Sequence, residues 1–553
     1  MLQKPASSSP ADDQIDSVIL RHLEWFRKPG VVSVRPGLRI TGGMLTKDPA
    51  IVVSVRKKTS NLPPDEVLPH QIEGIPVDVR PVSPAEALRA TDPEAFAQQL
   101  ADVPRGNVPI ELQTANFPLE RNLDGRLISP LVDKAVARVR PRRPGEPKLG
   151  LAARPTYQKL PPATFKAITD NFKVTCFASP DAGWPTLKPF LNSVNKTLTV
   201  GMYEFTAPHI VATVGQRMAG KTLNLVLDDP DYDTTMREQT NDATHDQLVS
   251  ALGGSMKFAW AAEGADKHNS IHLFPAAYHI KVAVADSRTF FLSSGNFNST
   301  NQPESDPINA PTSNDTHDIS RRDRDWHVIV EHAGLSSIFE NLILRDLEQA
   351  SPGQQDARAP VLKGSGNTPG KPFTKFFPAK TFSGDMTIQP ALTPDNYVDV
   401  VLPIIQEANH KFWMQTQYIK SSSRFQQDLE LPVAQRTILE QLIDAVRVLS
   451  DKQVDVRIIV DSRVTPTMIE YLDKVGGLDG SRIRRQHNVH NKGMIVDDEI
   501  VVVGSQNWST EGVDSNRDAS VVIRDAEVAA YWTEIFSNDW ETMTLLQEGP
   551  PQS

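Results

Sequence analysis

The chain has 553 residues, of which 39% are hydrophobic and 23% are charged, and its formal net charge is −10. This composition is ordinary for a folded, soluble protein, and the length allows several domains of roughly 100–200 residues each. The negative charge argues against a protein that coats nucleic acid with a basic surface, although it is compatible with a local basic cleft. The one cysteine, Cys176, excludes an internal disulfide and any cysteine-based zinc site.

The N-terminal residues carry no apolar core segment, so we expect no secretory leader. Residues 1–12 are rich in Ser and Pro and are expected to form a disordered tail. No apolar run approaches the roughly 20 residues of a membrane-spanning helix. We therefore expect a cytoplasmic protein without a transmembrane segment, in which Cys176 lies buried in a strand.

Residues 13–140 have the pattern of a small α+β accessory domain. Helical spacing of apolar residues over 13–26 precedes apolar runs at 31–34, 51–55 and 75–79, which predict strands. The stretch contains no Gly-x-Ser-x-Gly element, and its few histidines define no catalytic triad. We interpret this domain as a docking or regulatory module.

A Pro-rich linker follows at residues 141–165, and it is locally basic. Such a stretch is typical of a solvated, semi-rigid tether. The same charges also suit a phosphate-rich polymer or an anionic membrane, so this alternative stays open.

The remaining chain divides into two halves, residues 166–350 and 378–545, which a linker at 351–377 joins. Each half alternates predicted helices and strands, which favours an α/β fold with a mixed or mostly parallel sheet and helices on its faces. One predicted strand in each half ends in an aspartate, Asp228 or Asp461, and we expect these two positions to correspond. The first half carries two polar insertions, at 231–245 and 298–324, which suit either lids and specificity loops or simple flexible additions.

One stretch imitates a phosphate-binding loop. Gly215 to Thr222 fits the pattern Gly-x4-Gly-Lys-Thr. The motif requires a strand before it and a helix after it, whereas here the predicted order is reversed. We therefore do not expect nucleotide binding at this position.

A longer motif occurs twice, once in each half. The copies begin at His279 and His490, and each has a lysine two residues on, an aspartate seven residues on and an asparagine seventeen residues on. Residues two apart in a strand point to the same face, so His and Lys of one copy can address one ligand. An imidazole, a cation and neutral donors together suit an anionic oxygen cluster, most naturally a phosphate.

This pair of His-x-Lys-x4-Asp motifs, each followed by a Gly-Ser-x-Asn-like element, resembles the phospholipase D superfamily. The resemblance covers roughly residues 171–540, with one departure, since Ser293 stands where the motif usually has glycine. It implies two α/β/α repeats related by pseudo-twofold symmetry and one shared active site between them. In that chemistry no metal or cofactor takes part.

The resemblance also implies the role of each site residue. His279 would be the nucleophile that forms a covalent phosphohistidine, and His490 the general acid and base, although the spacing alone leaves the two roles interchangeable. The residues expected to hold the phosphate oxygens are Lys281, Lys492, Asn296 and Asn507. The supporting residues are Asp325 and Asp518, where the family commonly has a carboxylate that orients a histidine, and Ser294 and Ser505, as hydroxyls of the site wall. Asp286 and Asp497 are assigned to structure.

We favour a phosphodiesterase that hydrolyses phospholipid headgroups, with peripheral contact to a membrane. The chain is expected to be monomeric because both half-sites lie in one chain. A metal-independent nuclease is the first alternative, supported by the basic linker and by the arginines of residues 482–485. A non-catalytic binding protein with a degenerate phosphodiesterase core is the second, and the complete His, Lys and Asn sets argue against it.

Overall fold

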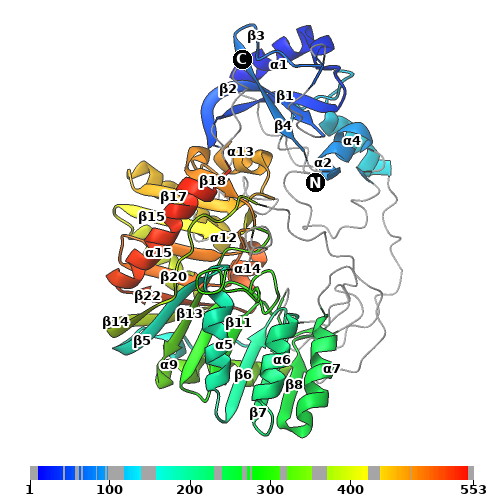
Figure 1. Ribbon diagram of the computed structural model, residues 1–553. Coiled ribbons are helices and arrows are strands. Elements are labelled where there is room, and N and C mark those ends of the chain that lie inside the picture. Colours follow the sequence, from blue (N-terminus) through cyan, green and yellow to red (C-terminus); the bar gives the residue numbers. More distant parts are fainter. Residues whose placement is uncertain are drawn as a thin grey trace.

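The computed structural model describes most of the chain (Figure 1). The described residues are 10–41, 44–56, 62–63, 66–82, 84–93, 96–97, 117–138, 157–228, 239–263, 271–274, 277–311, 320–350, 370–420, 436–474 and 476–545. The tail up to residue 9, the expected linker up to residue 156, and residues 351–369 of the second expected linker lie outside this part. So do residues 231–238 and 312–319 of the two polar insertions.

The N-terminal region folds around a small sheet with the strand order β1-β2-β4-β3. Its strands are β1 (Val31–Thr41), β2 (Met44–Val55), β3 (Gln71–Ile72) and β4 (Ile75–Pro81), and its helices are α1 (Pro10–Arg21), α2 (Pro84–Thr91) and α4 (Ile128–Arg138). The helix α1 begins at Pro10, so residues 10–12, which we expected in the disordered tail, are helical instead. It ends at Arg21, and the short 3-10 turn η1 (Leu23–Phe26) continues the apolar pattern.

This region is joined to the second half by buried ion pairs. Glu470, on helix α13 (Pro466–Lys474), lies 2.7 Å from Arg35 Nη2 and 3.1 Å from Arg80 Nη1. Ile40 and Leu45 are buried in the same apolar cluster as the helices of the second half. The small sheet is therefore packed against the second half (Figure 1).

The described part of both halves shares one sheet of 14 strands, in the order β18-β17-β15-β19-β20-β22-β14-β5-β13-β12-β11-β6-β7-β8. Read outward from the central β14–β5 pair, the two halves place their strands in the same sequence. The first half contributes β5 (Ile168–Ser179), β6 (Thr197–Met202), β7 (Thr222–Leu227), β8 (Met256–Trp260), β11 (Lys281–Ala285), β12 (Thr289–Ser293) and β13 (Asp325–Glu331). The second contributes β14 (Lys380–Thr393), β15 (Lys411–Thr416), β17 (Asp455–Asp461), β18 (Ile483–Gln486), β19 (Lys492–Val496), β20 (Ile500–Gly504) and β22 (Asp518–Arg524).

The sheet is mixed rather than mostly parallel. Only the outer strands of each half run parallel, β6-β7-β8 in the first and β15-β17-β18 in the second. The motif strands β11 and β19 pair antiparallel with both of their neighbours. Short two-stranded pairings, β9 (Ala262–Glu263) with β10 (Ile271–His272) and β16 (Ile419–Lys420) with β21 (Trp508–Ser509), lie outside the large sheet.

Three apolar clusters bind the helices to the two halves of the sheet. Side chains alternate along β11, so Val282 and Val284 lie in a central apolar cluster, whereas Ala283 and Ala285 lie in an outer one. The central cluster also contains strands of the second half and two helices. The central helices are α9 (Ala333–Gln349) and α15 (Ala526–Asn538). The outer helices are α5 (Gly183–Ser193), α6 (Pro208–Arg217) and α7 (Asn241–Leu252) on the first half, and α10 (Tyr397–Gln406), α12 (Ile438–Asp451), α13 and α14 (Thr510–Asp514) on the second. Short turns η4 (Pro162–Phe165), η5 (Gly253–Ser255), η7 (Gly480–Arg482) and η8 (Asp539–Met543) complete the described elements.

Several local predictions are confirmed. Cys176 is fully buried in β5, and burial raises the pKa of its thiol. The imitation phosphate-binding loop lies between helix α6 and strand β7, the reverse of the order that the motif needs. The α/β fold class predicted from the alternating elements is also confirmed.

Candidate active site

The two motif histidines lie where the halves meet, and each is held by a carboxylate of the other half. His279 Nδ1 lies 2.7 Å from Asp518 Oδ1, and His490 Nδ1 lies 3.0 Å from Asp325 Oδ1. Both histidines are largely buried, and both aspartates are completely buried. Because each carboxylate contacts Nδ1, a further ligand would be met by Nε2 of each ring, which at His490 also lies 3.1 Å from Lys492 Nζ.

The backbone crosses between the halves in the same way. The N–H of His279 donates to the carbonyl of Arg517, and the N–H of His490 donates to the carbonyl of Arg324. These arginines immediately precede the two aspartates and are themselves completely buried. Each crossing therefore fixes a histidine through its backbone and its ring together.

Each buried arginine is neutralised by two carboxylates. Arg324 pairs with Asp181 at 2.7 Å and with Asp539 at 2.9 Å. Arg517 pairs with Asp346 at 2.9 Å and with Asp395 at 2.7 Å. Sequence analysis missed these arginines, although an Arg-Asp pair in both halves was a visible sign of the repeat.

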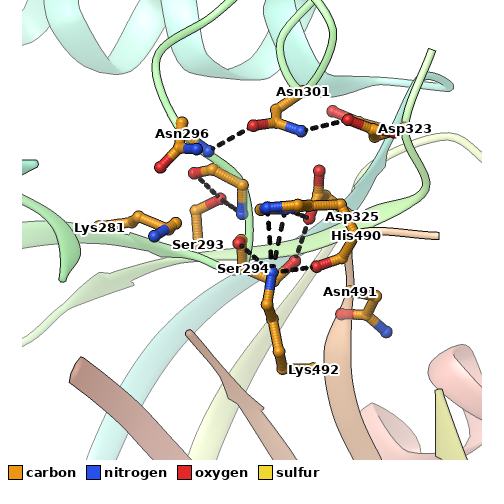
Figure 2. A network of polar contacts seen from close by, with 12 residues as sticks. Lys281, Ser293, Ser294, Asn296, Asn301, Asp323, Asp325, His490, Asn491 and Lys492 are labelled. Carbon is orange, nitrogen blue, oxygen red and sulfur yellow. Dashed lines mark hydrogen bonds and ion pairs between the residues drawn. The ribbon is translucent and has the colours of Figure 1, made fainter. Parts of the chain in front are cut away.

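Ser294 and Ser505 lie behind the aspartates and do not form the wall of the site. The hydroxyl of Ser294 donates to Asp325 Oδ1 and that of Ser505 to Asp518 Oδ1, each over 2.6 Å. Both serines are fully buried. Their expected place as hydroxyls of the site wall is therefore wrong, and the structure places them as supports of the carboxylates, as Figure 2 shows for the first pair.

Each lysine lies beside the histidine of its own motif, as Figure 2 shows for Lys492 and His490. Lys492 Nζ is 3.1 Å from both ring nitrogens of His490, and Lys281 Nζ is 2.7 Å from the carbonyl oxygen of His279. Burial lowers the pKa of Lys281 to about 8 and that of Lys492 to about 7, despite the nearby carboxylates. A site that destabilises its own ammonium groups in this way favours the arrival of an anion.

The histidines are electrostatically different from free imidazole. Burial, together with Lys281, lowers the pKa of His279 to about 4. Burial, with both lysines, lowers the pKa of His490 well below its ordinary value. Burial also raises the pKa of Asp325, whereas at Asp518 His279 and hydrogen bonding outweigh burial and lower the pKa. Asp518 is thus the more firmly charged of the two carboxylates.

Asn296 and Asn507 occupy matching positions after strands β12 and β20. Their amide oxygens are buried and have no hydrogen-bond partner among the described residues. In the first half, the backbone N–H of Asn296 donates to Asn301, which in turn donates to Asp323 (Figure 2). The described beginning of the second polar insertion is therefore packed directly against the site.

The first half carries a carboxylate that sequence comparison of the halves could not reveal. Glu204 Oε2 accepts from Asn298 Nδ2 at 2.8 Å and from Asn296 Nδ2 at 3.4 Å. Register places Met202 opposite Lys281 and Thr416 opposite Lys492, so Glu204 corresponds to Tyr418 in the second half. The two halves are thus chemically unequal at this position.

Ser293 replaces the glycine that is usual in the motif, and the residue opposite it on the next strand also differs between the halves. Ser293 lies opposite His327, and their side chains meet at 2.7 Å between Oγ and Nδ1. In the second half, Gly504 lies opposite Ser520, whose hydroxyl would be 1.6 Å from any Cβ added at Gly504. Ser293 also accepts the N–H of Gly295 at 2.7 Å, so the turn that presents Asn296 is tied down by a side chain.

The remaining aspartates of the motifs are structural, as predicted. Asp286 accepts from three consecutive backbone N–H groups, those of residues 195–197, at 2.7–2.9 Å. Asp497 does the same for residues 409–411. The strand-end aspartates also correspond, since Asp228 accepts the N–H of Tyr278 and Asp461 that of Val489. Both hold the residue directly before a motif histidine.

Among the described residues, no group of three or more His, Cys, Asp or Glu side chains is placed to bind a metal ion. No described helix is long and apolar enough to cross a membrane.

Comparison with known proteins identifies similar sequences. A family model described as "Cardiolipin synthase, PLD-like domain" matches residues 401–540. The mitochondrial cardiolipin hydrolase of Mus musculus is 30% identical over 110 residues, which are 18% of this chain and 47% of that protein. The Xenopus tropicalis protein of the same name is 25% identical over 221 residues, 39% of this chain and 90% of that protein. This chain thus spans about half the length of the mouse relative.

Solved structures that show some similarity to this chain include phosphatidylserine synthase from Haemophilus influenzae. It is 12% identical with a TM-score of 0.43, over 67% of this chain and 87% of that one. Nuc, a phospholipase D family member from Salmonella typhimurium, is 20% identical with a TM-score of 0.24, over 30% of this chain and 99% of that one.

Proposed function

We propose that this chain is a phosphodiesterase that hydrolyses phospholipid headgroups through a covalent phosphohistidine, because residues 401–540 match a family model described as "Cardiolipin synthase, PLD-like domain". The observation that carries the proposal is the crossed pairing of His279 with Asp518 and of His490 with Asp325. It directs two imidazoles, accompanied by two lysines, to one junction between the halves. Two histidines around one phosphodiester divide nucleophilic and acid–base work between them.

His279 is proposed as the nucleophile. Its depressed pKa keeps the ring neutral near pH 7, and the charged Asp518 holds a proton on Nδ1. The lone pair on Nε2 attacks phosphorus, a P–N bond forms, and the bond from phosphorus to the leaving oxygen breaks. The carboxylate stabilises the positive charge that develops on the ring.

His490 is proposed as the acid and then the base. It gives its proton to the leaving oxygen, and afterwards takes one from water as that water attacks phosphorus and the P–N bond breaks. Its pKa is lowered by burial and by the two lysines. A phosphodiester anion beside those lysines offsets their charge, so substrate binding is expected to bring a proton onto His490.

Lys281, Lys492, Asn296 and Asn507 are proposed to hold the non-bridging oxygens. Charge on these oxygens grows as phosphorus becomes five-coordinate, and donors in a buried site stabilise it more strongly than water does. The amide oxygens of the two asparagines have no hydrogen-bond partner within the described part of the chain, which supports a further contact there, such as the attacking water.

A phospholipid substrate is supported by the matched family and by the named hydrolase relatives. The nuclease alternative relied partly on the arginines of residues 482–485. Arg482 and Arg484 line a cavity together with Asp455, the first residue of β17. The last residue of that strand, Asp461, instead accepts the N–H of Val489, which precedes His490. Arg482 and Arg484 therefore give no support to a nucleic acid track, whereas Arg485 lies opposite Val460, toward the Asp461 end of the strand.

The decisive experiment compares wild type, His279→Asn and His410→Asn in the presence of EDTA. Substrates are vesicles of phosphatidylcholine, vesicles of cardiolipin, and single- and double-stranded DNA. We expect lipid cleavage that His279→Asn reduces by about 10³-fold or more and that the exposed control His410→Asn leaves intact. Cleavage of DNA alone would establish the nuclease instead, and an inactive wild type would overturn the proposal.

The two histidine roles are separated by bis(p-nitrophenyl) phosphate, whose leaving group needs no proton. His490→Asn should release one p-nitrophenolate per enzyme in a burst and then stall as the phosphohistidine. His279→Asn should give no burst. The reverse pattern would exchange the two roles.

A further inference from the structure

A cavity of about 480 Å³ lies between the N-terminal sheet and the second half. Its walls include Met44 of β2, the start of β17, residues around β18, and Trp540. Strand β17 runs from Asp455 in this cavity to Asp461 near His490. None of the residues that line the cavity belongs to the candidate active site, although Arg484 lies opposite Ile459, two residues before Asp461. The cavity is therefore distinct from the candidate active site.

Three arginines line this cavity, together with two carboxylates. The arginines are Arg457, Arg482 and Arg484, and the carboxylates belong to Asp455 and Glu541. Asp455 is shared, because it pairs with Arg457 at 3.1 Å and reaches Arg482 only at 3.9 Å. Arg482 also lies 3.7 Å from Asp479 Oδ2, so the lining holds three guanidinium groups and two carboxylates, with a third carboxylate beside it.

Arg484 is the least compensated of the three. Its Nη1 donates to the carbonyl of Trp540 at 2.6 Å, and its guanidinium lies 4.1 Å from the Trp540 ring centroid. Its Nε is buried without a hydrogen-bond partner among the described residues. Burial and the neighbouring Arg457 lower its pKa, which shows that the surroundings disfavour its charge. A buried donor of this kind costs stability until an acceptor arrives.

We propose that this cavity binds the phosphate group of a small phosphomonoester. Guanidinium groups present paired N–H donors that match phosphate oxygens, and three of these groups line this cavity. The volume lies in the range of small-molecule sites, and the apolar wall of Met44, Val456 and Trp540 suits a hydrocarbon portion of the ligand. The ligand would contact the accessory domain and the second half together, which gives the N-terminal region a binding role.

The test is titration calorimetry of the full chain with inorganic phosphate, glycerol 3-phosphate and a short-chain phosphatidic acid. The variant Arg482→Gln/Arg484→Gln should weaken binding at this site by at least about 10-fold. Arg447→Gln, on α12 and outside the cavity, is the matched control. The last two ligands distinguish a free phosphomonoester from a lipid headgroup as the source of the phosphate.

Phosphate is also expected at the candidate active site, so Lys281→Met/Lys492→Met is titrated in parallel. Binding that survives the lysine changes and disappears with the arginine changes supports the cavity, whatever becomes of the proposed catalysis. Unchanged stoichiometry and affinity in the arginine variant would overturn the proposal. If the double arginine variant does not fold, Arg482→Gln alone serves, because that side chain is about half exposed.

Discussion

His279 Nδ1 lies 2.7 Å from Asp518 Oδ1, although 239 residues separate them in the chain. The reciprocal pair, His490 and Asp325, is 165 residues apart. Each half therefore lends its carboxylate to the histidine of the other half. A single half would have a histidine and a lysine but no partner for the imidazole.

The crossed pairing predicts that Asp518→Asn acts on the first half's histidine. With bis(p-nitrophenyl) phosphate, the burst should slow by about 10²–10⁴-fold, because the imidazole loses the carboxylate that fixes its tautomer. Asp325→Asn should instead leave the burst and slow the steady-state rate that follows. Stopped-flow absorbance measures both phases, and an exchange of the two effects would contradict the crossed assignment.

Asp286→Asn is the matched control for these changes. Asp286 belongs to the same motif but accepts backbone N–H groups at a turn away from the histidines. We expect a lower melting temperature and an unchanged burst. A slowed burst would show that loss of any motif carboxylate disturbs the site.

A second prediction concerns Ser293 and His327, which meet at 2.7 Å and are both fully buried. Ser293→Gly should destabilise the fold by about 1–3 kcal/mol, because it leaves a buried imidazole nitrogen without this partner. Adding His327→Ser imitates Gly504 and Ser520 of the second half and should restore part of the loss. Urea unfolding of the double-mutant cycle measures the coupling, and additive losses would refute it.

A third prediction follows from the pKa of Lys492, which is lowered to about 7. An ammonium loses its charge as pH rises through its pKa, so the affinity for tungstate, an anion throughout this range, should fall from pH 6 to pH 9. The competitive inhibition constant against bis(p-nitrophenyl) phosphate reports this affinity. In Lys492→Arg the decrease in tungstate affinity near pH 7 should disappear, because arginine stays charged. The decrease near pH 8, which belongs to Lys281, should remain. An identical profile in the variant would be evidence against this origin.

A fourth prediction concerns the contact between the accessory domain and the second half. Glu470→Gln removes the carboxylate that Arg35 and Arg80 share, leaving buried guanidinium charge, and should cost about 3–5 kcal/mol of unfolding free energy. Glu534→Gln breaks an exposed pair with Lys375 and should cost at most about 1 kcal/mol. Chemical denaturation compares the two, and equal losses would mean that the buried network contributes no more than a surface pair.

Much of the fold followed from the repeat, because a pattern that folds twice must place the same residue types at the same strand positions. This argument correctly matched Asp228 with Asp461 and assigned Asp286 and Asp497 to structure. It left open whether the sheet is mixed or mostly parallel, because local alternation of helices and strands does not specify which strands pair. The antiparallel motif strands depend on long-range contacts that periodicity cannot report.

The residues of the candidate site could be predicted from the sequence, but most of the contacts between them could not. Nothing in the spacing indicates that Asp518 serves His279, because that contact depends on the central β14–β5 pairing. Glu204 escaped notice because the second half has Tyr418 in its place, so comparison of the halves could not mark it. Ser294 and Ser505 were found by their spacing, but only their hydrogen bonds to Asp325 and Asp518 reveal that they hold carboxylates.

The crossed contacts also determine when the candidate active site can form during synthesis of the chain. A ribosome adds about 5–20 residues per second, so the 239 residues from His279 to Asp518 take roughly 10–50 s. During that time the first half can fold, but its histidine has no carboxylate beside it. The proposed nucleophile is completed only when β22, among the last strands synthesised, enters the sheet. Partly synthesised chains are therefore expected to have no phosphodiesterase activity.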